Sequence, residues 1–541
     1  MSRRHLSTLA LFSAAALGLT ACAGGATAAD GGAGTDRTLV YAHQQEPACV
    51  FGGWIEQAYL SYQVLDSLTS LDENGKAVPW LATDWKSSAD GLTWTLNLKD
   101  GVKFTDGTAV DAAAVAANFD YWVDGGNSTA AVWLGGYYDS AKAVDATTLA
   151  IKLKRPYPQL PETISQGYFG IQSAKALKER TAEQNCEAPI GSGAFTVSEW
   201  NRGQNILLKR NDEYASWPAN AKVQGPAKLA AVDWRFVPDG TTRATALKAD
   251  EVDAIYDVPA IDWQQLEQGG FQLQKYVTGG RPQALTFNTR EGIFKDESVR
   301  KAFAYSLDRP ALVKTVGLDV IPFEGNGSVS QATTDYSQKA ADAYGYDAAK
   351  ANQLLDAAGW TERDAEGYRT KDGKVLEAKL PYGAGSIVTA DGASILQGVA
   401  EQAKAVVFKV TLISVPQSEL FSGAYSKPNE RDIYAGYWTS VTSGILYINW
   451  RPDTEKSPNG NNSAFTQDAT LEKFILKGNS ASDPAERAKA YQDAQEYIAD
   501  HAYAIGLYDR LSTLAVAPDV VDVWQEHSQG GPVFHDAHFS S

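Results

Sequence analysis

The stretch from Tyr62 to Phe119 constrains the fold most, because its turns and strands follow one another at close spacing. Four dipeptides typical of tight turns divide it, namely Asn74-Gly75, Asp90-Gly91, Asp100-Gly101 and Asp106-Gly107. Between the second and third turns, residues 93–98 alternate between polar and apolar side chains, as a half-buried strand does. After the last turn, residues 108–119 have helical spacing. The stretch therefore predicts a β-hairpin followed by a helix, and it specifies no chemistry.

The same stretch resembles the signature of the bacterial extracellular solute-binding proteins of family 5, the oligopeptide-, dipeptide- and nickel-binding proteins of ABC importers. The resembling pieces occur in one order, as Leu81-Ala82 with Trp85, Ser88 with Asp90-Gly91, Val102-Lys103-Phe104 and Asp106-Gly107. The resemblance implies an α/β fold of the periplasmic-binding-protein type (type II, a hinged trap). It also implies two lobes, with an extra small subdomain in the first lobe.

Three later segments also resemble this family. The turn Pro189–Phe195 enters a strand and is followed by Trp200, Gly203, Arg210-Asn211 and Tyr214. Residues 294–309 form an amphipathic helix pattern ending in Asp308-Arg309, and residues 347–360 form a helix pattern ending in Gly359-Trp360. Strand patterns alternate with helix patterns along the chain, which independently favours α/β lobes.

A chain of 541 residues is too long for one hydrophobic core, so several lobes are expected. The predicted boundaries are 1–22 for a lipoprotein signal peptide, 23–37 for a flexible tether, 38–70 with 189–285 and 506–541 for lobe I, 71–188 for the small subdomain, and 286–505 for lobe II. The segments around 283–288 and 504–508 are expected to carry the two crossovers between the lobes.

The net charge of −17 argues against nucleic-acid binding, because an acidic surface repels phosphates. Residues 1–22 combine Arg3 and Arg4 with an apolar run too short to span a bilayer, and they end in a sequence that resembles a bacterial lipobox. By that resemblance, Cys22 is lipidated and becomes the mature N-terminus. Ordinary signal cleavage nearby, with a free Cys22, is the alternative.

Two cysteines remain, Cys49 and Cys186. In an exported chain, two cysteines most often form one disulfide, because the compartment is oxidising. A pair of free, buried thiols is the alternative.

Candidate ligand-binding residues follow the first strand and lie in an aromatic segment. Gln44, Gln45 and Glu46 come just after the strand at 38–42, and ligands of open α/β sheets collect beyond strand ends. Trp133 and Tyr137 lie in the segment 133–138, which we expect to be a loop. Each of these residues could equally be structural, as a solvated strand end or as core aromatics.

A second candidate region begins where the strand pattern 432–438 ends in Tyr437 and Trp438, which offer stacking surfaces. In peptide-binding relatives, an Asp three residues after this Trp pairs with the ligand's ammonium group and is followed by Asp-Pro. Here Val441 and Gly444-Ile445 occupy those positions. We therefore expect no free peptide amino group at this point.

A neutral, amide-rich or N-blocked solute fits the region better, for example a siderophore-like, glycan-like or metal-chelate molecule. Four hydroxyl side chains would bind it, namely those of Thr439, Ser440, Thr442 and Ser443. They could instead satisfy backbone groups within the loop. Glu46 is an alternative partner for an ammonium group.

No cofactor or metal site is predicted. Of six histidines, His43 and His501 are isolated, and the His535–His538 pair lacks further ligands at suitable spacing. No nucleotide-binding motif is visible.

The sequence thus favours a non-enzymatic, lipid-anchored binding protein on the outer side of the cytoplasmic membrane. It would act as a monomer, capture a peptide or peptide-like solute and deliver it to ABC permease subunits with cytoplasmic ATPases. A secreted hydrolase acting on glycans or peptides is the alternative, although the sequence singles out no pair of catalytic carboxylates. A surface receptor that signals without transport is a third possibility.

Overall fold

The computed structural model describes residues 37–51, 55–126, 128–317, 320–385, 387–455 and 459–540. The predicted signal peptide with Cys22, and the predicted tether apart from Arg37, lie outside the described residues. All the helices and strands named below belong to the unit Gly34–Ser541.

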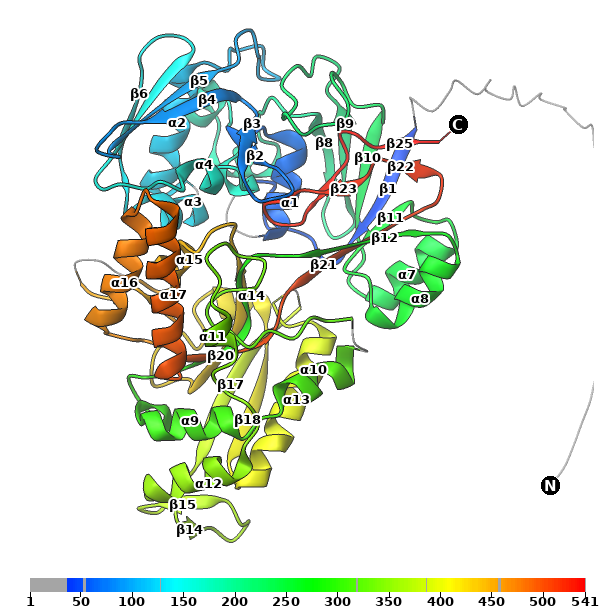
Figure 1. Ribbon diagram of the computed structural model, residues 1–541. Coiled ribbons are helices and arrows are strands. Elements are labelled where there is room, and N and C mark those ends of the chain that lie inside the picture. The colour runs from blue at the N-terminus through cyan, green and yellow to red at the C-terminus, as the bar shows by residue number, and fades with distance from the viewer. Residues whose placement is uncertain are drawn as a thin grey trace, which may run out of the picture. The chain divides into compact units, whose positions relative to one another are not determined.

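The largest sheet has seven strands in the order β12-β21-β11-β1-β10-β9-β8 (Figure 1). They are β1 (Thr38–His43), β8 (Phe195–Asn201), β9 (Asn205–Arg210), β10 (Ala231–Phe236), β11 (Ala254–Tyr256), β12 (Gln272–Val277) and β21 (Leu511–Val516). β1 pairs in parallel with β10 and β11, and its apolar residues are buried, as is usual for an inner parallel strand. All seven strands fall within the segments that we assigned to lobe I. The helices α7 (Gly240–Lys248) and α8 (Trp263–Gln268) connect its strands.

The glycine-rich turn at 191–193 packs directly on the end of helix α1 (Ile55–Val64). A Cβ atom on Gly191 would lie 2.1 Å from the Val64 carbonyl oxygen, and one on Gly193 would lie 2.4 Å from the Val64 carbonyl carbon. Between the two glycines, the Ser192 hydroxyl donates to the buried carboxylate of Asp66 at 2.8 Å. The glycines are therefore required for close approach of two backbones.

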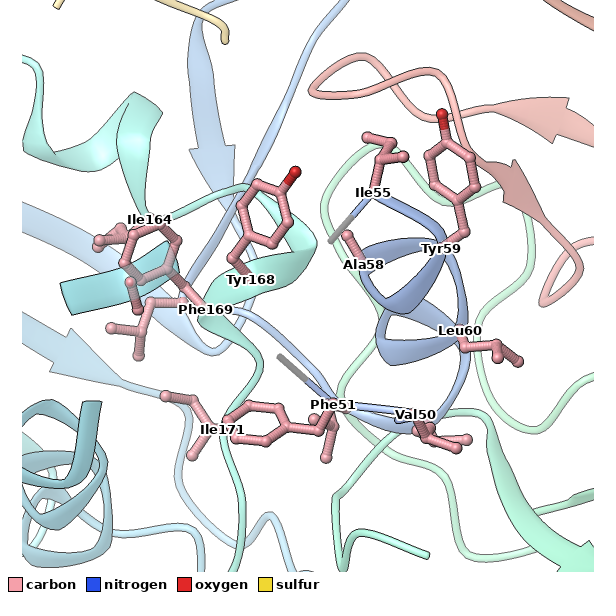
Figure 2. Close-up of a cluster of buried hydrophobic side chains, with 14 of the residues drawn as sticks. Val50, Phe51, Ile55, Ala58, Tyr59, Leu60, Ile164, Tyr168, Phe169 and Ile171 are labelled. Atoms are coloured by element: carbon pink, nitrogen blue, oxygen red, sulfur yellow. The ribbon is translucent and has the colours of Figure 1, made fainter. Parts of the chain in front are cut away.

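Helix α1 is the centre of a buried apolar cluster. In Figure 2, Ile55, Ala58 and Tyr59 of α1 lie beside a second segment that carries Tyr168 and Phe169. The two segments belong to lobe I and to the small subdomain as we predicted their boundaries, so one continuous core joins these two parts.

The small subdomain contains a four-stranded antiparallel sheet in the order β4-β5-β7-β6. Its elements are β4 (Ala82–Ser87), β5 (Thr93–Leu98), α2 (Ala112–Tyr121), α3 (Ser128–Leu134), β6 (Tyr138–Ala143), β7 (Thr148–Leu153), α4 (Leu160–Thr163), α5 (Ala174–Glu179) and α6 (Ala182–Glu187). The predicted hairpin is present, with β4 paired to β5 and β5 paired to β7. β2 (Thr69–Leu71) and β3 (Ala77–Pro79) form a separate hairpin.

Two local predictions in this subdomain were wrong. The helix after Asp106-Gly107 begins at Ala112, because the Val110 amide donates to the Val102 carbonyl and Asp111 caps the helix. The segment 133–138 is not wholly a loop, because Trp133 belongs to α3, where its side chain is 2% exposed. In both places, contacts outside the local pattern decide the backbone conformation.

A second core surrounds a three-stranded sheet in the order β19-β13-β20 and a parallel pair β17-β18. Their bounds are β13 (Gly280–Phe287), β17 (Glu377–Ala384), β18 (Lys409–Pro416), β19 (Ile433–Thr439) and β20 (Ala504–Tyr508). The accompanying helices are α9 (Glu297–Tyr305), α10 (Arg309–Gly317), α11 (Gln338–Ala341), α12 (Ala348–Ala357), α13 (Ala390–Ala403) and α14 (Gln417–Phe421). Short strands complete the chain, namely β14 (Glu362–Arg363), β15 (Arg369–Lys371), β16 (Lys374–Val375), β22 (Val520–Val521), β23 (Trp524–Gln525), β24 (Pro532–Val533) and β25 (His538–Phe539).

The chain passes between the seven-stranded and three-stranded sheets twice, between β12 and β13 and between β20 and β21. The two crossovers are bonded to each other, since the backbone N–H and the side-chain hydroxyl of Thr278 both donate to the Arg510 carbonyl, at 3.0 and 3.1 Å. Both connections between the sheets are thus short, and two hydrogen bonds from Thr278 join them to each other.

Three further helices are α15 (Ile445–Trp450), α16 (Ala469–Ser480) and α17 (Pro484–Asp500), and α16 and α17 lie side by side (Figure 1). We assigned their residues to lobe II, yet their buried apolar side chains belong to the same core cluster as those of the small subdomain. These helices therefore connect the second lobe to the small subdomain.

The disulfide joins Cys49 to Cys186, with Cα atoms 4.9 Å apart. Beside it, the Val50 amide donates to the Cys186 carbonyl at 2.9 Å. The bond ties the segment after β1 to the end of α6.

We expect Gly193→Ala to lower the free energy of unfolding by about 1–3 kcal/mol, because the added methyl group would overlap the backbone of Val64. Gly345→Ala is the matched control, since no atom lies within 4 Å of a Cβ at Gly345, and it should change stability by less than about 0.5 kcal/mol. Urea denaturation measures both. Equal stability of the two variants would contradict the proposed packing of the turn.

Candidate functional site

A cavity lies beside the two crossovers, and its walls come from both sheets. It encloses about 70 Å³. The part of the chain around the seven-stranded sheet contributes Asp257, Val258, Ala260, Trp263, Leu511 and Thr513. The part around the three-stranded sheet, which we call lobe II from β13 onwards, contributes Gln283, Ile321, Ile387, Thr389, Asp391 and Tyr437, and the second crossover contributes Tyr508, Asp509 and Arg510. Aromatic, acidic and basic side chains therefore converge on one space where the two lobes meet, as is typical of a ligand site.

Arg510 connects the lobes across this cavity. Its Nη2 donates to the Tyr256 hydroxyl at 2.9 Å, in lobe I. Its guanidinium carbon also lies 4.4 Å from the centre of the Tyr437 ring, in lobe II. A cation placed on an aromatic face is attracted to it, most strongly where water is excluded. Arg510 thus fixes the position of Tyr437, the one predicted ligand-binding residue that lines the cavity.

The end of β1 lies behind this arginine. His43 is fully buried, its ring stacks on Tyr256 with centroids 4.9 Å apart, and its Nδ1 lies 3.0 Å from the Tyr41 hydroxyl. Burial lowers the pKa of His43, and the positive charges of Arg243 and Arg510 lower it further. The ring is therefore neutral at physiological pH and serves as a support for Tyr256.

The predicted residues that follow β1 do not line the cavity. Gln44 is buried at 9% exposure and Gln45 is half-buried. Glu46 accepts a hydrogen bond from the Trp200 indole at 2.7 Å and another from the Gly203 amide at 3.0 Å. Its carboxylate thus ties the chain after β1 to the β8–β9 hairpin, a position from which it has no contact with the cavity.

The hydroxyls after Trp438 bond mainly to backbone groups. The Ser440 hydroxyl donates to the Thr442 carbonyl at 2.8 Å, and the Ser443 hydroxyl donates to the Thr334 carbonyl. The Gly444 amide donates to the Thr442 hydroxyl at 3.3 Å. Thr439 is buried in the β13–β19 pairing, and Trp438 and Val441 are half-buried. In this conformation the loop 439–443 is stabilised by hydrogen bonds to backbone groups, and none of its residues lines the cavity.

Tyr137 belongs to a contact between the small subdomain and helices α15–α17. Its ring stacks on Tyr157 with centroids 4.3 Å apart, and its hydroxyl accepts a hydrogen bond from Asn479. Arg155 lies 4.5 Å from the centre of the Tyr137 ring and 4.7 Å from that of Tyr447, and it donates to the Tyr447 hydroxyl. We call these five residues the aromatic junction. A Cβ on Gly136 would lie 2.7 Å from Arg155 Nη2, so the glycine leaves room for this contact.

Trp133 and Tyr137 therefore have different surroundings from those expected of ligand-stacking residues. Trp133 is buried in the core of the small subdomain, and Tyr137 bridges to α16. Neither lines the cavity beside the crossovers.

A carboxylate pair lies near the second crossover. Glu324 is 1% exposed and accepts hydrogen bonds from the Tyr336 hydroxyl at 2.7 Å and from the Asn326 and Gln331 amides at 2.6 and 3.0 Å. Burial raises the pKa of Glu324 to about 7, and the charge of Asp509 contributes to the rise. Burial also raises the pKa of Asp509 to about 6. These two groups therefore change charge near neutral pH.

Tyr437 was predicted from the sequence, whereas Asp257, Asp391 and Arg510 were not. Arg510 could have been singled out, since it lies two residues after the strand that we assigned to the second crossover. Asp257 comes directly after a strand and Asp391 lies in a helix, and neither local pattern is unusual. Only the tertiary structure brings the two residues to one cavity. Within the described residues, no three His, Cys, Asp or Glu side chains are grouped so that they could hold a metal ion.

We expect Glu324→Gln to reduce the pH dependence of stability. The folded-state pKa of Glu324 lies above the unfolded value, so ionisation costs stability; the cost is full above about pH 7 and is relieved as the pH falls towards about 4.5. The gain in unfolding free energy between about pH 8 and about pH 5 should shrink by on the order of 1–3 kcal/mol. Urea denaturation at both pH values measures it, with the exposed Glu366→Gln as control. An unchanged pH dependence in the Glu324 variant would contradict this account.

Comparison with known proteins agrees with this architecture. The family model of the "Bacterial extracellular solute-binding proteins, family 5 Middle" matches residues 76–465, more than half of the chain. The nickel-binding periplasmic protein of Escherichia coli (strain K12) is 27% identical over 375 residues, 68% of each chain. The glutathione-binding protein GsiB of the same strain is 27% identical over 446 residues, 80% of each chain.

Among solved structures, the oligopeptide-binding protein AppA from Bacillus subtilis, in complex with a nonapeptide, has the same fold. Its TM-score is 0.80 at 21% identity, over 94% of this chain and 99% of that chain. The predicted two-lobed α/β fold is thereby confirmed. The chain belongs to family 5 of the bacterial extracellular solute-binding proteins, the substrate-binding components of ABC importers for peptides, nickel or similar solutes.

Proposed function

We propose that this protein is a lipid-anchored substrate-binding protein that captures a peptide or peptide-like solute between its lobes and delivers it to ABC permease subunits. The anchor would be Cys22, on the outer side of the cytoplasmic membrane. The cytoplasmic ATPases of the importer would supply the energy. The protein itself would bind and release its solute without covalent chemistry, as a monomer.

The observation that carries this proposal is the cavity beside the crossovers. Its walls come from lobe I, lobe II and the second crossover. A solute held there would contact both lobes at once, so binding and closure would be coupled. Aromatic faces from Trp263, Tyr437 and Tyr508 would supply apolar contact, and the charged side chains would fix the orientation of the solute.

Two sets of contacts support hinge closure as the mechanism. The crossovers are short and bonded to each other through Thr278 and the Arg510 carbonyl, which favours rotation about this point. The aromatic junction joins the small subdomain to α15 and α16, where Arg155 donates to Tyr447 and Asn479 donates to Tyr137. Opening would separate these polar and aromatic contacts, and with them the apolar side chains of α15–α17 that share a core cluster with the small subdomain.

The cavity volume indicates whether the lobes would need to open before a solute could enter. About 70 Å³ is below the roughly 300–1,000 Å³ of typical ligand pockets, so a peptide-sized solute would require the lobes to open. The relatives named above bind nickel, glutathione and a nonapeptide, as their names and titles state. Because members of the family bind different solutes, the solute of this protein would depend on the side chains that line its own cavity.

We expect the purified protein to release a small solute on mild denaturation, identifiable by mass spectrometry. After refolding, that solute should change tryptophan fluorescence saturably and be recovered intact. Tyr437→Ala should weaken binding at least about tenfold, because it removes an aromatic wall of the cavity.

The matched control is Tyr346→Ala, because Tyr346 is 53% exposed and does not line the cavity. It should bind as the unmodified protein does. Recovery of the solute as fragments would favour the hydrolase alternative, and equal binding by both variants would place the site elsewhere.

Lipid attachment at Cys22 predicts a change of location. Each helix of the described residues is too short or too polar to cross a bilayer, and acyl chains on Cys22 would hold the protein at the membrane surface. Cys22→Ser, expressed in the native host, should move the protein from the membrane to the soluble fraction and abolish incorporation of a labelled fatty acid. Ala26→Ser is the control. A Cys22 variant that still incorporates the label would overturn the assignment.

A further inference from the structure

One carboxylate in the cavity, that of Asp391, has neither a hydrogen bond nor an ion pair among the described residues. Asp391 belongs to the first turn of α13, follows the N-cap Thr389 by two residues and is half-buried. It lines the cavity. Among the described residues, none makes a hydrogen bond or ion pair with its side chain, and the negative charge of another acid, Asp257, acts on it.

Asp257 faces the same cavity from lobe I. Its carboxylate lies 3.5 Å from Arg243 Nη2, and that arginine is buried and donates to backbone carbonyls. Asp257 therefore has its own cation, whereas Asp391 does not. Burial raises the pKa of Asp391, and the negative charge of Asp257 raises it further.

These contacts make the closed arrangement unfavourable for the ionised protein alone. Closure brings two carboxylates from different lobes to one partly buried cavity, where like charges repel more strongly than in water. A cation between them would reverse this effect, since a dehydrated carboxylate and a dehydrated cation stabilise each other. The cavity lining holds three acids, Asp257, Asp391 and Asp509, against the single base Arg510.

The packing of α13 holds Asp391 in place. A Cβ on the next residue, Gly392, would lie 2.5 Å from the Tyr508 hydroxyl, so the helix start is pressed against the second crossover strand. Position 441, where the family resemblance would place an acidic anchor, is Val441, and it does not line the cavity. An acid is thus present at the solute cavity, but on a different element.

We propose that Asp391 is the anchor for a cationic group of the bound solute, an ammonium or guanidinium group, and so determines specificity. The inference rests on the proposed function and departs from our expectation of a neutral solute. A purely structural role, in which Asp391 only complements the positive end of α13, would leave binding unchanged on substitution.

The test compares Asp391→Asn with Glu183→Gln. Glu183 is the second residue of helix α6, as Asp391 is of α13, but it is exposed and does not line the cavity. The probes are a random pool of peptides of about two to nine residues and two N-acetylated pools of the same lengths, one with Lys and Arg and one without them. A small-molecule extract of the native host is the fourth probe. Native mass spectrometry identifies what binds, and calorimetry then measures affinity for each bound species.

We expect the unmodified protein and the Glu183 variant to select species that carry an organic cation. The Asp391→Asn variant should bind these at least about tenfold more weakly, and Asp391→Glu should restore part of the affinity. Loss of binding on N-acetylation would identify the amino terminus as the cation, whereas dependence on Lys or Arg would identify a side chain.

Three results would overturn the inference while leaving the proposed function intact. These are selection of solutes without a cation, unchanged affinity in Asp391→Asn, and binding of Ni²⁺, added as its chloride, in place of organic cations through Asp391. If the unmodified protein binds nothing from any pool, the proposed function itself fails.

Discussion

The two connections between the sheets are hydrogen-bonded to each other, and this bond fixes the residues around the cavity. Thr278 donates twice to the Arg510 carbonyl, so the two connections between the sheets are held at one point. The Arg510 side chain then reaches Tyr256 in one lobe and the Tyr437 ring in the other. The same residue that joins the connections therefore also forms part of the cavity wall, so a solute bound in this cavity would lie next to the proposed hinge.

The lobes meet at the cavity and at the aromatic junction, where interactions of opposite effect act. Those at the cavity disfavour contact, and those at the junction favour it. At the cavity, Asp257 and Asp391 repel each other and several polar groups have lost their water. At the aromatic junction, stacked tyrosines and the Arg155–Tyr447 hydrogen bond favour contact. A binding protein needs such a balance, because its open and closed states must differ by an amount that the solute can supply. In the proposed function, the solute changes this difference by binding in the cavity.

Much of the fold could be predicted from local patterns, because Asp-Gly turns and alternating segments act over a few residues. The β4–β5 hairpin, the strand that follows the glycine turn and the crossover strand ending at Tyr508 follow from such patterns. The start of α2 could not, since Val110 bonds back to Val102. In the candidate site, Tyr437 could be predicted because it lies near the end of a strand that ends in aromatic residues. Asp391 could not, because its place in the cavity beside Asp257 depends on contacts between segments that are distant in sequence. The hydroxyls of Ser440 and Ser443 looked available in sequence, yet they bond to backbone groups.

In the proposed function, the solute binds at the crossovers and contacts both lobes. Hydrogen–deuterium exchange, comparing protein stripped of its solute with protein saturated by it, tests this binding position. We expect slower exchange in peptides covering 256–263, 387–392, 436–439 and 507–513, with little change in the β4–β5 hairpin. Protection confined to one lobe, or concentrated away from these four segments, would contradict it.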